Sequence, residues 1–336
     1  MIDTVVMRGI SELRTIEQAW WLLWERCSRR TPFQSPGWLL PWYRAFRPGE
    51  PVAFAFWQAG RLVGIAPFYA KHETYGFHLQ PFGTPVSDFL DILAEPGWED
   101  RVVEAFAVAL AAETGWSTVT FDELAPDATA LRLKTLHACT AFEQIASTCP
   151  VLTLERKVPV ESNLPPHMRR NLRKAHHRAA RRGEVRFILA DEGTAQCTFD
   201  RLVDLHAARW RARDQAGVLA GERIRQFHAD VINVLYPKGV ARVYELRIAG
   251  QTAAAYYGFQ DSGRAYAYLS AFDLRFARES PGSLLLGHVI ADSIGADVRE
   301  FHFLRGSETY KYAWGADDRH NHRRQFVRVA AFADVI

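Results

Sequence analysis

One pattern of segments occurs twice in this chain of 336 residues, and it limits the folds that the chain can adopt. In each half, two runs of alternating small and large residues flank an Ala-Gly pair, at Ala59-Gly60 and again at Ala249-Gly250. Two such runs around a short glycine-containing turn are typical of a β-hairpin. A helical segment and a short apolar strand then follow each hairpin. The repeat predicts a duplicated α/β unit, although two ordinary α/β segments could also coincide in this way.

The expected elements fill both halves of the chain. The first copy has strands over 52–57 and 61–69, extended pieces over 77–94, a helix over 99–114 and a strand over 117–124, preceded by helical segments over 12–29 and 38–46. The second copy has strands over 240–248, 251–260 and 264–271, a helix over 282–295 and a strand over 300–304, preceded by helices near 195–213 and 222–235. Because a domain typically has about 150 residues, we expect two domains, 1–160 and 161–336.

A strongly basic helix is expected between the two copies, over 165–182, because prolines at 165 and 166 suit a first helical turn. Its apolar face consists of Leu164, Met168, Leu172, Ala175 and Ala179. Its other face carries Arg169, Arg170, Arg173, Lys174, Arg178, Arg181 and Arg182, with no acidic residue. Two interpretations remain open: a face that is solvated or paired with acids elsewhere, or a docking surface for the phosphates of a cofactor or a nucleic acid.

Composition narrows the class of protein. A hydrophobic fraction of 48% and a charged fraction of 24% exclude general disorder. The net charge of +3 is not that of a dedicated nucleic-acid-binding protein, so any basic docking surface must be local, and no DNA partner is expected. The four cysteines show no C-x-x-C spacing and are interpreted as reduced thiols of a cytosolic protein.

Neither a signal peptide nor a membrane span is expected from the residue pattern. The first ten residues lack a charged region followed by an apolar run. No window approaches the ~20 apolar residues that a bilayer requires. The run Trp20–Trp24 is flanked by charged residues and is more typical of a packed core helix than of an interfacial one. A cytoplasmic protein without membrane insertion is predicted.

The stretch 278–315 holds the residues best suited to chemistry. Ser280-Pro281-Gly282-Ser283 has the character of a helix N-terminus, whose backbone N–H groups and dipole favour an anion. A short aromatic strand precedes Arg305, Glu308, Tyr310 and Lys311. An anion-binding helix start followed by ionisable groups at a strand exit suits a reaction centre, and it also suits an ordinary βαβ fragment.

The absence of four sequence motifs argues against dinucleotide oxidoreductases, P-loop enzymes, serine hydrolases and zincins. The chain has no G-x-G-x-x-G after a strand, no P-loop, no G-x-S-x-G and no H-E-x-x-H. The run D-D-R-H-N-H at 317–322 contains metal-ligand residue types, but adjacent residues rarely converge on one ion. We interpret it as a polar turn before a strand over 325–331, and no metal is expected.

The order of strand meander, phosphate-binding loop, helix and strand resembles the GNAT (Gcn5-related N-acetyltransferase) fold. With R-R-N-L-R-K-A at 169–175, R-G-S-E-T-Y-K-Y-A-W-G at 305–315 and S-P-G-W-L-L-P-W at 35–42, the chain is similar to the CelD/BcsL group of GNAT-like acyltransferases, associated with cellulose and exopolysaccharide biosynthesis, and to the wider FemABX ligases. The resemblance implies an α/β (α+β) tandem GNAT-like fold with two mixed sheets flanked by helices. It also implies acyl transfer to an amine or hydroxyl, from acyl-CoA, an acyl carrier protein or an aminoacyl-tRNA.

The resemblance also implies a donor site. In GNAT proteins the strand before the key helix splays from its neighbour, the thioester enters the gap, and the pyrophosphate lies on the helix N-terminus. The family motif is Gln/Arg-x-x-Gly-x-Gly/Ala. At the two positions where the motif has small residues, this chain has Pro281 and Ser283. The residues assigned to the donor are Ser270, Arg278, Gly282, Ser283, Leu284, Arg170 and Arg173.

Three residues near the end of the chain are candidates for catalysis. Tyr310 is the candidate acid for the departing thiolate, with a packed aromatic as the alternative. Lys311 is the candidate ligand of donor phosphate or oxyanion, with a surface lysine as the alternative. Glu308 is the candidate base, with an ion pair to Lys311 three residues on as the alternative.

The first half is expected to serve the acceptor. Its loop at 94–100 is acidic and would repel an anion, so only domain 161–336 is expected to bind the donor. Asp88, Asp91 and Asp122 are candidates to face an acceptor sugar or amine, with turn capping as the alternative for each. The expected function is an acyltransferase; an aminoacyl-tRNA-dependent ligase and a catalytically degenerate scaffold remain as alternatives.

Overall fold

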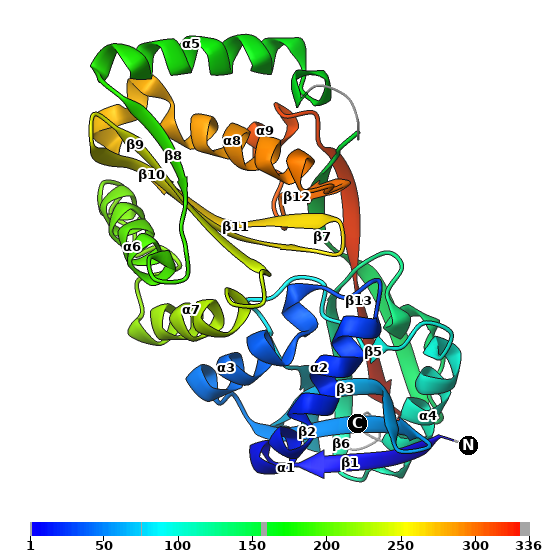
Figure 1. Ribbon diagram of the computed structural model, residues 1–336. Helices are drawn as coiled ribbons and strands as arrows, with labels where there is room; N and C mark the ends of the chain where they lie inside the picture. Colours follow the sequence, from blue (N-terminus) through cyan, green and yellow to red (C-terminus); the bar gives the residue numbers. More distant parts are fainter. Residues whose placement is uncertain (1, 75, 156–159, 330–336) are drawn as a thin grey trace. The chain divides into compact units, whose positions relative to one another are not determined.

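The computed structural model describes residues 2–74, 76–155 and 160–329 (Figure 1). The chain forms two compact units, one of Met1–Ser147 with His320–Ile336 and one of Thr148–Arg319. These borders differ from the expected one at 160/161. The reason is strand pairing: the end of β7 (Cys139–Thr153) pairs with β12 (Glu300–His302) of the second unit, and β13 (Asp317–Arg328) pairs with β6 (Trp116–Leu124) of the first.

The first unit is built on a mixed sheet with the order β1-β2-β3-β4-β6-β13. Strands β4 and β6 are parallel, α4 connects them, and the other neighbours are antiparallel. The bounds of its other elements are β1 (Asp3–Arg8), α1 (Ile10–Thr15), α2 (Glu17–Arg26), α3 (Pro36–Phe46), β2 (Glu50–Gln58), β3 (Arg61–Glu73), β4 (Gly76–Pro81), β5 (Leu93–Ala94) and α4 (Glu99–Ala112).

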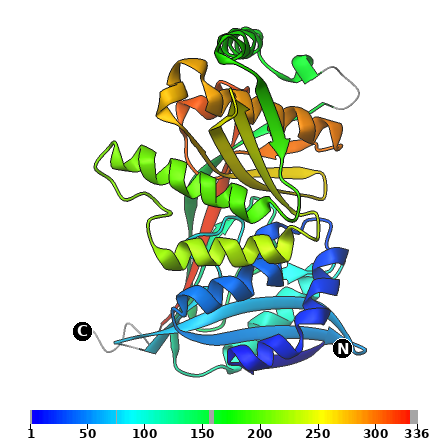
Figure 2. The same cartoon turned by 60° about the vertical axis from the view of Figure 1, so that its left-hand side comes forward.

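The second unit has the corresponding order β7-β12-β11-β10-β9-β8, in which β11 and β12 are parallel and α8 connects them. Its further elements are α5 (Pro166–Arg182), β8 (Val185–Leu189), α6 (Ala195–Arg211), α7 (Glu222–Leu235), β9 (Ala241–Ile248), β10 (Gln251–Asp261), β11 (Arg264–Phe272), α8 (Pro281–Gly295) and α9 (Thr309–Tyr312). Helices α6 and α7 lie side by side on one face of the sheet, and α8, covered by α5, lies on the other (Figures 1 and 2).

The predicted duplication is confirmed. In each unit an antiparallel hairpin precedes a helix, and the helix leads into a strand parallel to the end of the meander. The two hairpins turn in the same way: φ is 48° and 76° at Ala59-Gly60, and 50° and 78° at Ala249-Gly250. Two successive left-handed residues form the turn that matches the natural twist of a hairpin. The repeated Ala-Gly pair therefore marks a repeated structure.

Three local predictions were wrong. The helix expected over 12–29 is two helices, α1 and α2, that meet at Ile16. The run 317–322 is not a polar turn but the beginning of β13, whose neighbour strands supply the backbone hydrogen bonds. Strands β1 and β7 were not predicted, because most of their described side chains are exposed and give no apolar alternation.

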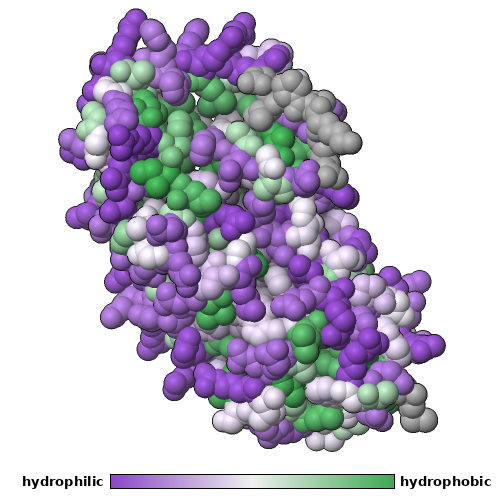
Figure 3. Space-filling view, in the orientation of Figure 1, coloured by the Kyte–Doolittle hydropathy of each residue, from purple (hydrophilic) through white to green (hydrophobic). Residues whose placement is uncertain are grey.

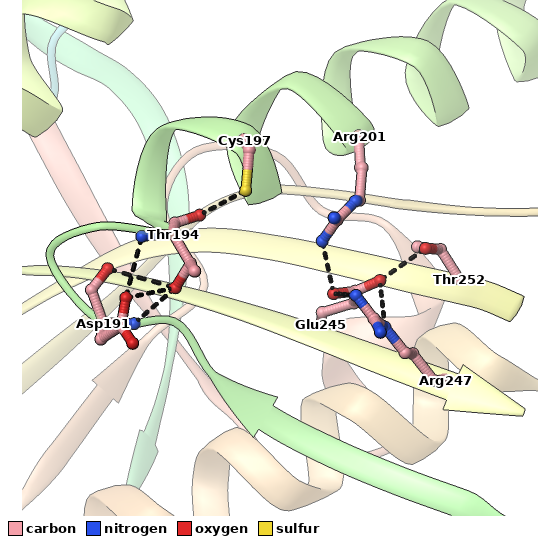
Figure 4. A network of polar contacts seen from close by, with 7 residues as sticks. All are labelled: Asp191, Thr194, Cys197, Arg201, Glu245, Arg247 and Thr252. Atoms are coloured by element: carbon pink, nitrogen blue, oxygen red, sulfur yellow. Dashed lines mark hydrogen bonds and ion pairs between the residues drawn. The ribbon is translucent and has the colours of Figure 1, made fainter. Parts of the chain in front are cut away.

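A buried carboxylate fastens α6 to the sheet (Figure 4). Glu245 of β9 is 1% exposed, and its oxygens lie 2.8 Å from Nη1 of Arg201 on α6 and 3.0 Å from Nε of Arg247. Burial raises the pKa of Glu245, but hydrogen bonds from Arg247 and Thr252 and the two positive charges outweigh it, so the net pKa lies below its usual range. At the start of α6, Asp191 and Thr194 exchange backbone-to-side-chain hydrogen bonds of 2.9 Å. Both contacts fix the helix.

The predicted apolar face of the basic helix is confirmed. Met168, Ala175 and Ala179 of α5 are buried, and Leu172 packs beside them. Helices α5 and α8 approach each other closely at Gly287, where a Cβ atom would lie 3.1 Å from Cδ1 of Leu172. Among the residues that the structure describes, every helix is too short or too polar to span a lipid bilayer.

A pair of glycine variants tests this packing. We expect Gly287→Ala to be less stable than Gly282→Ala by about 1–2 kcal/mol, because the new methyl at 287 meets Leu172 and Trp314, whereas at 282 it makes an ordinary contact with Phe272. Gly282 lies in the first turn of α8 and Gly287 in its interior, so Gly287→Ala gains more helix propensity, and its lower stability can come only from packing. Urea unfolding of the two variants measures it; equal midpoints and slopes would show that α5 does not press on α8.

Candidate functional site

The pairing between β11 and β12 ends early. It covers Arg264↔Glu300, Ala265↔Phe301 and Tyr266↔His302, whereas β11 continues to Phe272. On its other side β11 carries one extra residue, because Tyr257 of β10 faces Leu269 and Gly258 faces Ala267. A bulge of this kind bends a strand and increases its twist. Strand β12 itself ends at His302, so the backbone groups of β11 beyond Tyr266 have no partner in β12 and are left to bind something else.

The first turn of α8 lies beside this edge. Ser280 is left-handed, with φ 52°, and the helix begins at Pro281. The N–H of Leu284 already donates to the Ser280 carbonyl at 3.1 Å, so Gly282 and Ser283 carry the N–H groups that can bind an anion. A Cβ atom on Gly282 would lie 3.4 Å from Cδ1 of Phe272, which places the α8 start next to the end of β11. Ser270 is exposed on the same strand.

Two arginines of α5 hold the loop that leads into α8. The Nε atom of Arg178 donates to the Arg278 carbonyl at 2.6 Å. The Nη1 atom of Arg182 donates to the Arg275 carbonyl at 2.9 Å and to Glu279 at 3.2 Å. These bonds explain part of the basic face: at its C-terminal end the charges fix the turn before the candidate phosphate site.

Arg170 and Arg173 lie elsewhere on α5. Leu172, between them in sequence, contacts Gly287, about 8 Å along α8 from Gly282. Together with Lys174, His177 and Arg181 they form an exposed strip, which we call the α5 strip, on the side of the helix opposite the core. The strip is part of the hydrophilic border along α5 in Figure 3. The structure thus places Arg178 and Arg182, rather than Arg170 and Arg173, at the start of α8.

Lys311 is buried, with 2% of its surface exposed, and is not a surface lysine. Its ammonium donates to the carbonyls of Leu304, Arg305 and Gly306 at 3.1, 2.7 and 2.9 Å. It also forms an ion pair of 2.9 Å with Glu308, the alternative that the sequence offered for that glutamate. Lys311 therefore ties the turn after β12 to α9 from within, and its donors are in use.

Tyr310 stands beside this fixed turn and exposes 53% of its surface. Partial burial and the Glu308 charge raise the pKa of Tyr310 to about 12, against the opposing charge of Arg209. Its hydroxyl is protonated near neutral pH and can give up a proton to a strongly basic group. Its ring meets Phe303 edge-on, with 6.4 Å between centroids.

The three aspartates of the first unit differ from one another. Asp91 accepts hydrogen bonds from the N–H groups of Ile92, Thr129 and Ala130 at 2.7–2.8 Å, which is the turn-capping role. Asp122 forms an ion pair of 3.3 Å with Arg323. Asp88 is 3% exposed. Only Asp122 keeps a partly exposed carboxylate next to a cation.

Sequence reasoning missed two residues near the end of the β11–β12 pairing. His302 stacks on Tyr266 with 5.0 Å between centroids, and its Nε2 lies 3.2 Å from Glu300. Burial lowers the pKa of His302, and Glu300 opposes this effect. Arg209 of α6 lies over the ring of Phe272 at 5.1 Å. The sequence offered no signal for Arg209, since nothing in it brings α6 to the end of β11.

The second unit matches the sequence model of a known domain family, and the fold of the chain is similar to that of solved structures. Residues 166–312 match the model of the acetyltransferase (GNAT) domain. None of the curated proteins that were compared matches the chain. Among solved structures, FemX superimposes with a TM-score of 0.67 at 9% identity, over 95% of this chain and 98% of that one.

Two further structures share the fold. A conserved protein of unknown function from Bacteroides thetaiotaomicron gives a TM-score of 0.58 at 10% identity, over 93% of this chain and 97% of that one. The C-terminal domain of a putative lysylphosphatidylglycerol synthetase from Agrobacterium fabrum gives 0.53 at 14% identity, over 88% and 90%. The predicted GNAT-like α/β fold is confirmed, and 166–312 is the part that matches a GNAT acetyltransferase domain.

Lys311→Met tests the buried ammonium. Methionine fills a similar volume but leaves three carbonyls without a donor, so we expect a loss of about 3 kcal/mol in unfolding free energy. The exposed Lys174→Met, on the α5 strip, is the matched control and should change stability by less than about 0.5 kcal/mol. Equal urea stabilities of the two variants would contradict a structural role for Lys311.

Proposed function

We propose that this protein transfers an acyl group from a thioester donor, acyl-CoA or an acyl carrier protein, to an amine or hydroxyl of a small acceptor. The observation that carries the proposal is the early end of the β11–β12 pairing beside the first turn of α8. The unpaired edge of β11 offers backbone donors for a thioester, and the α8 start offers N–H groups for phosphates. The match of 166–312 to a GNAT acetyltransferase domain supports the same reaction class.

Each residue near this place has a role in the proposal. Gly282 and Ser283 bind donor phosphate through backbone N–H groups, on a loop that Arg178 and Arg182 hold in position. Tyr310 protonates the departing thiolate, because its hydroxyl carries its proton at neutral pH. Lys311 and Glu308 act as positioning residues: their ion pair fixes the turn that carries Tyr310.

The donor and acceptor sides are assigned to different units. The first turn of α8 has no acidic residue, whereas α4, its counterpart, begins with Glu99 and Asp100. Carboxylates at a helix start occupy its N–H groups and repel an anionic ligand. We therefore assign donor binding to the second unit, and we propose that the first unit, through Asp122, contributes to acceptor binding. A saccharide acceptor in exopolysaccharide synthesis is proposed from the CelD/BcsL resemblance.

Tyr310→Phe tests the acid. With acetyl-CoA and a panel of amine and amino-sugar acceptors, we expect the rate of thiol release to fall by about 10²–10⁴-fold with little change in KM for the donor, because only proton transfer to the leaving group is lost. Tyr312→Phe is the control: that hydroxyl bonds Asp318 at 2.8 Å. If the Tyr310→Phe enzyme releases thiol at the parent rate, Tyr310 is not the acid.

A second candidate function is an aminoacyl-tRNA-dependent ligase. The α5 strip favours it, because exposed cations on a helix that has no acidic residue of its own suit a phosphate backbone, and the fold likeness to FemX is compatible with it. If the protein is such a ligase, its affinity for tRNA should fall steeply as the salt concentration rises. The Arg170→Gln and Arg173→Gln variants should also bind tRNA more weakly. If no thioester and no tRNA raises the melting temperature, a scaffold role replaces both enzymatic proposals.

A further inference from the structure

Two arginines at the end of α6 have no acidic partner in the part of the chain that the structure describes. Arg209 is half-buried, with its guanidinium 5.1 Å from the ring centre of Phe272. Arg213, in the following turn, lies 5.8 Å from the ring centre of Trp210. Both contacts are with aromatic rings, and no ion pair with Asp or Glu accompanies them among the described residues.

This arrangement is unfavourable without a ligand. Arg213 follows the last residue of α6 and is exposed, but its charge acts on that of Arg209, which partial burial deprives of screening water. Burial lowers the pKa of Arg209 first, and the charge of Arg213 lowers it further, against the opposing effect of Tyr310. Arg201, two turns earlier on the same helix, has the buried Glu245 as its partner (Figure 4). The missing counter-charge at Arg209 is therefore a local feature of this end of α6.

The arginine pair lies close to the proposed reaction centre. The ring of Phe272 contacts the guanidinium of Arg209 and also stands 3.4 Å from the Cβ position of Gly282 in the first turn of α8. The charge of Arg209 also reaches Tyr310. One aromatic ring thus lies between the proposed donor phosphate site and Arg209, a cation that the donor site does not use.

We propose that Arg209 and Arg213 bind a phosphoryl group of the acceptor, so that the substrate acylated by this protein is a phosphorylated small molecule. Two guanidinium groups present forked donors and two positive charges, which a phosphoryl dianion satisfies and a single carboxylate does not. The identification of the bound molecule as the acceptor rests on the proposed acyl transfer. The binding of the anion itself does not depend on it.

Chemical protection tests the site on the unmodified protein. Phenylglyoxal modification of each arginine is followed by mass spectrometry with saturating inorganic pyrophosphate, or with succinate or chloride at equal ionic strength. We expect pyrophosphate to slow the modification of Arg209 and Arg213 about tenfold at ten times its Kd. The exposed Arg211 on the same helix should react at an unchanged rate. Equal rates for all three arginines, or equal protection by succinate, overturn the phosphoryl assignment.

A second set of protection experiments tests whether the arginine pair binds the acceptor or the donor. With CoA alone, Arg209 and Arg213 should remain reactive, and pyrophosphate should still protect them when CoA is present. Protection by CoA alone would assign the pair to the donor and overturn the acceptor proposal. As a variant test with saturating CoA present, so that the donor phosphate site is filled, Arg209→Gln should lose the pyrophosphate-induced rise in melting temperature that remains in Arg211→Gln. None of these readouts requires acyl transfer, so a failure of the proposed function is distinguishable from a failure of this inference.

Discussion

The second unit depends on one constraint: a parallel strand pair that stops after three residue pairs. Backbone N–H and C=O groups are costly to leave without partners, so a strand edge that is not paired must meet water or a ligand. Strand β12 ends at His302, whereas β11 continues to Phe272 with a bulge opposite Tyr257 and Gly258, and the first turn of α8 lies beside the end of that edge. Lys311 then holds the turn after β12 through three carbonyls.

The two copies of the fold share their topology but not their electrostatics. Both have a hairpin, a crossover helix and a parallel strand, yet the N–H of Gly97 before α4 already donates to Glu99. The corresponding start of α8 has left-handed Ser280, Gly282 and Ser283, and two arginines of α5 fix its loop. The first turn of α8 thus lacks the carboxylates that stand at the start of α4, which is the physical basis for assigning the donor to the second unit.

Features that depend on local sequence could be predicted, and those that depend on distant pairing could not. The Ala-Gly turns adopt their left-handed geometry from residues adjacent in the chain, and the apolar face of α5 follows from helical periodicity. The return of β13 to the first unit has no local signal, since D-D-R-H-N-H reads as a turn until its strand neighbours are known.

The candidate site divides in the same way. Gly282 and Ser283 could be predicted because a helix start has a sequence signature. The burial of Lys311 could not, since its ammonium fits a cage formed by the folded turn after β12. The placement of Arg178 and Arg182 against the α8 loop, and of Arg209 over Phe272, likewise depends on how α5 and α6 pack on the sheet.

The most direct test is hydrogen exchange of the full chain with and without saturating CoA. If the unpaired edge of β11 and the start of α8 bind the donor, amides of 267–272 and 282–285 should exchange more slowly with CoA, and those of the α4 start at 99–102 should not change. Unchanged exchange at both segments of the second unit, or protection at α4 instead, would contradict the assignment of the donor site.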